Sequence, residues 1–238
     1  MREQEEAAVL FSGGKDSMRT IELIKQSGYH VSCLISIISD NEDSYMLHTA
    51  AIEATRISSK ALDIPLVVGH TSGLKELELK DISATIKEAR AKFPFVTLAS
   101  GGIASSYQKE RIDRIARELG LKSEAPLWGI DQESYLLDLV SRDYHFILTS
   151  VSAEGLDRSW LGRRVDRLAA AAIVKLSKRY GFNPSFEGGE AETLVLDCPL
   201  FLKRKLRILA SDVDWRGGYG RLLIKAIELV PKEENDDP

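Results

Sequence analysis

Six consecutive residues near the N-terminus combine the residue types that hold a phosphate group. They follow an apolar run, residues 7–11, and they read Ser12-Gly13-Gly14-Lys15-Asp16-Ser17. Two glycines let the backbone bend sharply and approach a ligand with no Cβ in the way. The free N–H groups of the helix that follows then point at the ligand, and the helix dipole favours an anion there. The lysine charge and the serine hydroxyls complete a predicted phosphate site, although the Walker A spacing is absent.

A second glycine turn follows another apolar run, residues 95–99. Gly101 and Gly102 lead into a helical pattern that carries Lys109 and Arg111 near its start. A capped helix with surface charges would show the same residues, and this interpretation stays open. If both glycine turns lie on one sheet edge, they would hold the two ends of a polyphosphate. We therefore predict that Gly101 and Gly102 contribute to the same nucleotide site.

Three carboxylates surround a Gly-Gly pair in the second half of the chain. Glu187, Glu190 and Glu192 fall within six residues of one another. The alternative to a functional cluster is a solvated loop, but solvated loops more usually carry charges of both signs. We therefore predict an acidic pocket at this point of the chain.

A polar stretch follows the apolar run at residues 30–38. In it, Glu42, Tyr45 and His48 are spaced by three residues. At this spacing Tyr45 and His48 share one face at the start of a helix. The acidic and hydroxyl residues between them would cap that helix, but a cap does not account for the tyrosine and the histidine. We predict a functional role for this stretch.

The first half of the chain alternates apolar strands with amphipathic helices. Strands are predicted at residues 7–11, 30–38, 64–68, 95–99 and 121–125, and helices at 17–26, 45–62, 74–92 and 108–119. This alternation implies right-handed βαβ units and a parallel sheet that is covered on both faces. Ligands of such sheets bind beyond the carboxyl ends of the strands. The loops after the first, second and fourth strands are therefore the expected ligand site.

From about residue 126 the rhythm changes, and a smaller α+β domain is predicted. Its helices are expected at residues 132–142 and 166–180, and its strands at 145–151, 194–196, 200–209 and 221–230. The last two strands would be joined by a polar loop that contains glycines. The predicted domains are residues 1–127 and 128–231, and the acidic tail 232–238 is expected to be disordered.

The composition argues against several classes of protein. The chain has 238 residues and a net charge of -4, which argues against nucleic acid as its main partner. Cys33 and Cys198 are its two cysteines, and neither belongs to a C-x-x-C pair, so we expect free buried thiols and no zinc site. No apolar run approaches the ~20 residues of a membrane span, and no signal-peptide pattern is visible. We expect a cytoplasmic protein without membrane contact, and the sequence leaves the oligomeric state open, a homodimer included.

Several motifs together resemble a known family. The turn S-G-G-K-D-S resembles that of the N-type PP-loop ATP pyrophosphatases, which cleave ATP between the α and β phosphates. Further motifs follow in order up to about residue 201, namely S-x-x-E-x-S-Y-M-x-H, G-G-I-A-S-x-Y-Q-K-x-R, P-L-W, S-W-L-G and E-G-G-E-x-E-T. The complete set resembles the diphthine–ammonia ligase family in a minimal, archaeal-type form. One departure is Phe186, where the family is expected to have glycine.

The resemblance implies a parallel-sheet α/β PP-loop domain of the Rossmann-like HUP type and an ATP-dependent amide-forming ligase. Its partners would be ammonium and translation elongation factor 2 that carries diphthine, a trimethylated histidine derivative. ATP would adenylate the diphthine carboxylate, ammonia would attack, and AMP and pyrophosphate would leave. The triphosphate would lie over the turn from Ser12 to Ser17, with Lys15 stabilising charge in the transition state. Asp16 would bind Mg²⁺, which prefers oxygen ligands and phosphates.

The resemblance also implies roles for the second half of the chain. The carboxylates of Glu187, Glu190 and Glu192 would attract the trimethylammonium group, or hold ammonium and take its proton. Trp160 or Tyr45 would face the trimethylammonium through a cation–π contact. The candidate substrate ligands are Glu42, Tyr45, His48, Trp160, Glu187 and Glu190. Two other functions stay open, a PP-loop enzyme that adenylates tRNA and a nucleotide-binding sensor without chemistry.

Overall fold

The computed structural model describes residues 4–39, 52–72 and 77–232. By their contacts, these residues form two compact units. The first unit comprises Met1–Ser12, Asp16–Thr55 and Asp63–Gly129, and the second comprises Gly13–Lys15, Arg56–Leu62 and Ile130–Pro238. Three residues of the first glycine turn, Gly13–Lys15, therefore belong to the second unit. The domain boundary predicted at residue 127 stays a prediction.

The first unit contains a five-stranded sheet whose hydrogen-bonded pairs are all parallel. Its strands are β1 (Glu6–Leu10), β2 (His30–Ser39), β3 (Leu66–Thr71), β4 (Thr97–Ala99) and β5 (Lys122–Glu124), in the spatial order β3-β2-β1-β4-β5. The predicted parallel α/β sheet is thus confirmed. The chain leaves β1 toward β2 and later returns to its other side as β4, so a topological switch point lies between β1 and β4. Ligands of open α/β sheets bind at such a point.

Four helices connect these strands, and two of them pack on one face of the sheet. The helices are α1 (Lys15–Gln26), α2 (Ile52–Leu62), α3 (Leu77–Lys92) and α4 (Ser106–Glu118). Ile82 and Ile86 of α3 share one buried cluster with Ile112 of α4 and with alternate residues of β2, such as Cys33 and Ile35. Side chains that alternate along a strand point to the same face, so this cluster places α3 and α4 together over that face.

The second unit is built on an antiparallel sheet with the strand order β7-β6-β9-β8. Its elements are α5 (Gln132–Ser141), β6 (His145–Val151), the short 3-10 helix η1 (Arg158–Trp160), α6 (Arg167–Tyr180), β7 (Ala191–Asp197), β8 (Arg204–Arg216) and β9 (Tyr219–Pro231). Lys178 of α6 forms an ion pair with Glu133 of α5, with Nζ 2.7 Å from Oε2. The predicted α+β arrangement is confirmed for this unit.

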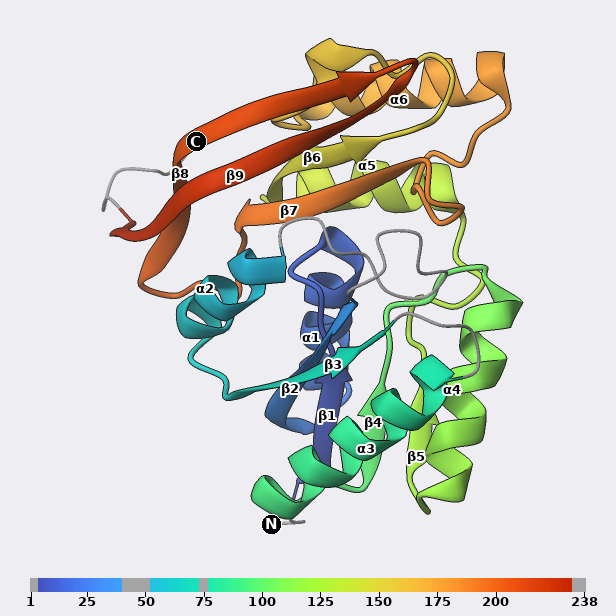
Figure 1. Ribbon diagram of the computed structural model, residues 1–238, viewed down its shortest axis with the longest axis vertical. Helices are drawn as coiled ribbons and strands as arrows, with labels where there is room; N and C mark the ends of the chain where they lie inside the picture. The colour runs from blue at the N-terminus through green and yellow to red at the C-terminus, as the bar shows by residue number, and fades with distance from the viewer. Residues whose placement is uncertain (1–3, 40–51, 73–76, 233–238) are drawn as a thin grey trace. The chain divides into compact units, whose positions relative to one another are not determined.

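The last two strands are longer than predicted, and the prediction of a polar loop over residues 210–220 is wrong. β8 and β9 pair along their whole length up to Arg216 and Tyr219, and they form a long ribbon (Figure 1). The turn consists of Gly217 and Gly218, whose φ angles of 55° and 97° are the positive values that a tight two-residue hairpin turn needs. The polar residues after Ser211 suggested a loop, but an exposed hairpin accommodates polar side chains within its strands. β7 is likewise longer than the three residues predicted for it.

The two cysteines are free and buried, as predicted from their spacing. Burial raises the pKa of both the Cys33 and the Cys198 thiols to about 12. Both groups therefore stay protonated at neutral pH, and a protonated thiol is a poor nucleophile. Among the described helices, none combines the length and the apolar composition that crossing a membrane requires.

Candidate active site

The first glycine turn connects the end of β1 to the start of α1, as the sequence predicts. Ser12 and Ser17 close it: the Ser12 backbone N–H donates to Ser17 Oγ at 3.3 Å, and the two hydroxyl oxygens are 3.4 Å apart. α1 begins at Lys15, so its first-turn N–H groups lie next to the turn. A helix N-terminus at the carboxyl edge of a parallel sheet favours an anion. The geometry thus agrees with the predicted phosphate site, and phosphate binding itself stays a prediction.

The second glycine turn lies directly against the first turn of α1. A Cβ added to Gly101 would lie 3.0 Å from the Asp16 carbonyl carbon and 3.1 Å from the Ser17 nitrogen. A Cβ on Gly102 would meet nothing within 4 Å. The helix that follows is capped by Ser105, whose side chain accepts from the Gln108 N–H. The sequence-based expectation that both glycine turns share one sheet edge is therefore met inside the first unit.

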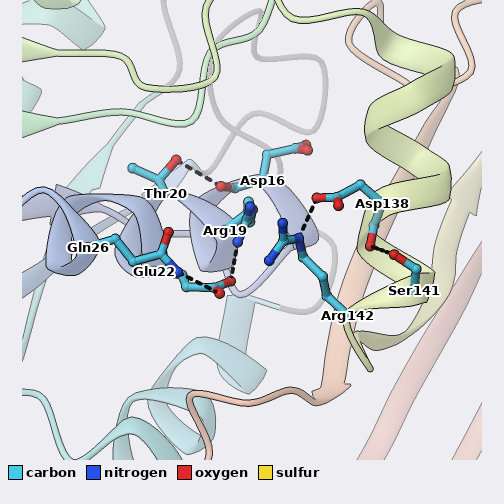
Figure 2. A network of polar contacts seen from close by, with 8 residues as sticks. All are labelled: Asp16, Arg19, Thr20, Glu22, Gln26, Asp138, Ser141 and Arg142. Atoms are coloured by element: carbon cyan, nitrogen blue, oxygen red, sulfur yellow. Dashed lines mark hydrogen bonds and ion pairs between the residues drawn. The ribbon is translucent and has the colours of Figure 1, made fainter.

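Polar contacts along α1 fix its first turns (Figure 2). Thr20 Oγ1 donates to the Asp16 carbonyl oxygen at 2.8 Å, and Arg19 Nη1 lies 2.6 Å from Glu22 Oε2. The Asp16 carboxylate points away from the Thr20 bond (Figure 2). Directly after the end of α5, Arg142 forms an ion pair with Asp138 of that helix, with Nε 2.6 Å from Oδ2 (Figure 2). The Arg19–Glu22 ion pair supplies an opposite charge to a buried cation in the first turns of α1.

Asp16 supplies the candidate carboxylate ligand for Mg²⁺ in the first glycine turn. Within the described residues, no group of three or more His, Cys, Asp or Glu side chains gathers in a way that could hold a metal ion. Mg²⁺ in nucleotide enzymes is typically held by one or two carboxylates together with the substrate phosphates. A single carboxylate beside a phosphate site therefore fits a metal that arrives with the nucleotide.

The side chain of Lys15 does not point to open solvent in this structure. It is 2% exposed, and its ammonium donates to the Ser185 carbonyl oxygen at 2.6 Å. Its backbone N–H donates to Thr193 Oγ1 at 3.1 Å, and the Val195 N–H donates to the Gly13 carbonyl oxygen at 3.0 Å. Sequence reasoning missed Ser185 and Tyr135 as neighbours of Lys15, because no local pattern links residues so far apart in the chain.

The acidic loop, residues 182–190, is organised by one of its own carboxylates. Glu190 Oε1 accepts from the Asn183 N–H at 2.9 Å, and Glu190 Oε2 accepts from the Gly188 N–H at 2.8 Å. The loop also contacts the segment after β6, because Ser152 Oγ donates to the Gly189 carbonyl oxygen at 2.8 Å. Glu187 and Glu192 are half-buried on the same stretch, which brings the three predicted carboxylates into one part of the second unit. Their catalytic roles stay predictions.

Trp160 lies in the predicted loop but packs into the second unit. It is 6% exposed, and the Arg163 guanidinium carbon lies 4.6 Å from its ring centroid. One face of the indole thus already has a cation, and the remainder is covered by protein. This geometry favours a packing role over direct contact with a substrate cation. The other predicted aromatic contact, Tyr45, lies outside the described residues together with Glu42 and His48.

We expect Trp160→Ala to lower the free energy of unfolding by about 3 kcal/mol, because it empties a buried aromatic site. Urea unfolding followed by circular dichroism measures this change. Leu168→Ala is the control, since Leu168 on α6 is 80% exposed and its loss should cost almost nothing. A Trp160→Ala protein with wild-type stability but weakened binding of a trimethylated substrate would restore the ligand role predicted from the sequence.

Two family profiles cover most of the chain. The profile described as diphthamide synthase N-terminal domain matches residues 5–123, and that described as diphthamide synthase C-terminal domain matches residues 131–230. The chain belongs to the diphthamide synthase family. Among individual members of this family, the diphthine--ammonia ligase of Homo sapiens is 31% identical over 225 residues, which cover 87% of this chain and 84% of the human protein.

A longer relative and a solved structure complete the comparison. The diphthine--ammonia ligase of Schizosaccharomyces pombe is 34% identical over 256 residues, covering 94% of this chain but only 42% of that protein. The chain therefore spans less than half of the fission yeast family member. A solved Methanocaldococcus jannaschii protein, described as a predicted tRNA methyltransferase subunit, is 21% identical with a TM-score of 0.43 and covers 83% of this chain and 100% of that one.

Proposed function

We propose that this chain is an ATP-dependent ligase that converts the diphthine carboxylate of translation elongation factor 2 to an amide. The observation that carries the proposal is the match to both diphthamide synthase domains, together with relatives named diphthine--ammonia ligase that are about as long as this chain. The close approach of Gly101 to the backbone of Asp16 and Ser17, all within the first unit, agrees with the nucleotide part of this activity. Since the substrate is a translation factor, the reaction would take place in the cytoplasm.

The first step is adenylation of the substrate. A carboxylate oxygen of diphthine attacks the α-phosphorus of ATP, pyrophosphate leaves, and a mixed anhydride with AMP forms. The N–H groups at the start of α1 and the hydroxyls of Ser12 and Ser17 would bind the phosphates, with Gly101 allowing their close approach. Asp16 would hold Mg²⁺, which neutralises phosphate charge when it is bound.

The second step is amide formation. Ammonia attacks the carbonyl carbon of the anhydride, AMP leaves with one oxygen of the former carboxylate, and the attacking nitrogen loses a proton. A free carboxylate is a poor acyl donor because its leaving group would be an oxide, whereas AMP is a good leaving group. Glu187, Glu190 and Glu192 are the candidate carboxylates for holding ammonium and accepting its proton. Glu190 also accepts from two backbone N–H groups of the acidic loop.

Product analysis tests this function. The protein is incubated with ATP, Mg²⁺, ammonium and diphthine-bearing elongation factor 2, and each component is omitted in turn. We expect AMP, pyrophosphate and an amidated factor only in the complete mixture. ADP and phosphate as the products would contradict adenylation. If AMP formed without amidation of the factor, ATP cleavage between the α and β phosphates would still hold, but a different molecule would accept the adenylyl group.

A further inference from the structure

The ammonium of Lys15 lies among Ser185, Phe186 and Tyr135, which belong to the second unit, as Lys15 itself does. These three residues are called the receptacle of Lys15. Besides its hydrogen bond to the Ser185 carbonyl oxygen, Nζ lies 5.6 Å from the ring centroid of Phe186 and 6.0 Å from that of Tyr135. Aromatic faces attract cations within about 6 Å, most strongly where water is excluded. Buried charges persist where such partners are available, so the receptacle accounts for a lysine that is almost fully buried.

The receptacle is held in place by its own hydrogen bonds. Ser185 is fully buried, and its Oγ lies 2.7 Å from Gln132 Oε1 and 3.0 Å from Asn183 Oδ1, either of which can accept its single hydroxyl proton. Its backbone N–H also donates to Asn183 Oδ1 at 3.0 Å. Both the backbone N–H and the hydroxyl of Ser185 are thus held by hydrogen bonds, in addition to the bond that its carbonyl oxygen accepts from Lys15.

Phe186 has a backbone conformation that bulky residues rarely adopt. Its φ angle is 66°, in the left-handed region that favours glycine. The peptide group that carries the Ser185 carbonyl ends at the nitrogen of Phe186, so this angle sets how the carbonyl lies relative to the phenyl ring. Such strain persists only where surrounding contacts determine it. The ring is 5% exposed, stacks on Phe182 at 6.4 Å, and faces the Lys15 ammonium.

We propose that Lys15 is a positioning residue that fixes the acidic loop to the glycine turn, and that Phe186 completes the receptacle through which it acts. Ser185 and Phe186 belong to the acidic loop, so the lysine holds that loop directly. Two further hydrogen bonds join the glycine turn to β7. The Lys15 N–H donates to Thr193 Oγ1, and the Val195 N–H donates to the Gly13 carbonyl oxygen. The inference rests on the proposed function, because it assigns the acidic loop to the amidation step.

Hydrogen exchange of the full-length protein tests this inference without any substrate. Phe186→Leu should raise the exchange rate of backbone amides in the acidic loop by about three- to thirtyfold, the range expected for losing one cation–π contact. Lys15→Met should raise it at least as much, because it also loses the hydrogen bond to the Ser185 carbonyl oxygen. Phe186→Tyr keeps an aromatic face and should exchange like the wild type. Phe186→Leu keeps an apolar side chain of similar size, so thermal unfolding should show a folded protein in each case.

The double variant separates positioning from simple packing. If the ring acts through the ammonium, Phe186→Leu should add little to the exchange rate of Lys15→Met. Full additivity of the two changes, or a wild-type exchange rate in either single variant, would overturn the proposal. An exchange rate for Phe186→Tyr that equals that of Phe186→Leu would also overturn it.

A kinetic comparison connects the receptacle to the reaction. In Phe186→Leu, the dissociation constant of a non-hydrolysable ATP analogue should stay within about threefold of wild type, while kcat for amidation falls about tenfold. Equal losses in both would show that the ring serves nucleotide binding and not the acidic loop. If the wild type made no amide, the proposed function would fail, whereas the exchange measurements would still decide the role of Lys15.

Discussion

Gly101→Val is expected to lower kcat/KM for ATP about a hundredfold or more. A side chain at this position must displace the backbone of Asp16 and Ser17, because even a Cβ would lie 3.0 Å from the Asp16 carbonyl carbon. These atoms belong to the first turn of α1, whose N–H groups are the proposed phosphate ligands. Displacement of a positioning element by about 1 Å can cost a hundredfold in rate. Steady-state kinetics with ATP as the varied substrate measure the effect.

The neighbouring glycine offers a matched control. Gly102 has no heavy atom within 4 Å of its added Cβ, and neither glycine has a positive φ angle. Gly102→Ala should therefore keep kcat/KM for ATP close to wild type, and Gly101→Ala should lie between Gly102→Ala and Gly101→Val. If Gly101→Val had the same kcat/KM for ATP as the wild type, the first turn of α1 would not bind the nucleotide.

Glu190→Ala is expected to lower kcat/KM for amidation about a hundredfold while ATP binding is retained. Both oxygens of Glu190 accept backbone N–H groups of the acidic loop, from Asn183 and Gly188. Removing an acceptor costs about 1–3 kcal/mol for each buried amide that it leaves unpaired, and less where water can replace it. The loop that carries Glu187 and the Lys15 receptacle would then lose its fixed conformation. Amidation kinetics and binding of an ATP analogue measure the two parts of this expectation.

Two further variants distinguish a structural role of Glu190 from a chemical one. Glu190→Gln retains one acceptor oxygen and should keep more activity than Glu190→Ala. Glu154→Ala removes an exposed carboxylate from the same unit and should behave like the wild type. If Glu190→Gln were as inactive as Glu190→Ala while hydrogen exchange showed an ordered loop, Glu190 would act on the substrate and not on the loop.

The nucleotide half of the candidate site could be predicted because its signals are local. An apolar strand, a Gly-Gly turn and a helix start stand next to each other in the sequence, and the alternation of strands and helices implies that such turns share one sheet edge. The contact of Gly101 with the first turn of α1 bears out that expectation. The helices and strands observed in the described residues of the first unit lie where the local pattern predicted them, although their first and last residues differ.

The second half of the site depends on contacts that no local pattern contains. Lys15 reaches a carbonyl group 170 residues further along the chain, a contact that no local pattern signals. Its role in phosphate binding stays a prediction. The acidic pocket predicted around Glu190 stays a prediction, and only the structure shows that the Glu190 oxygens accept backbone N–H groups. The left-handed backbone at Phe186 is equally hidden, because a bulky aromatic residue gives no signal for it.

The most direct test of the account follows an oxygen atom. Elongation factor 2 is prepared with both oxygens of the diphthine carboxylate replaced by a heavy isotope, and the products of a single turnover are analysed by mass spectrometry. An acyl-adenylate requires that one heavy oxygen leaves with AMP and that the other stays in the amide. Unlabelled AMP beside an amidated factor, or heavy oxygen in inorganic phosphate, would contradict activation of the substrate by adenylation.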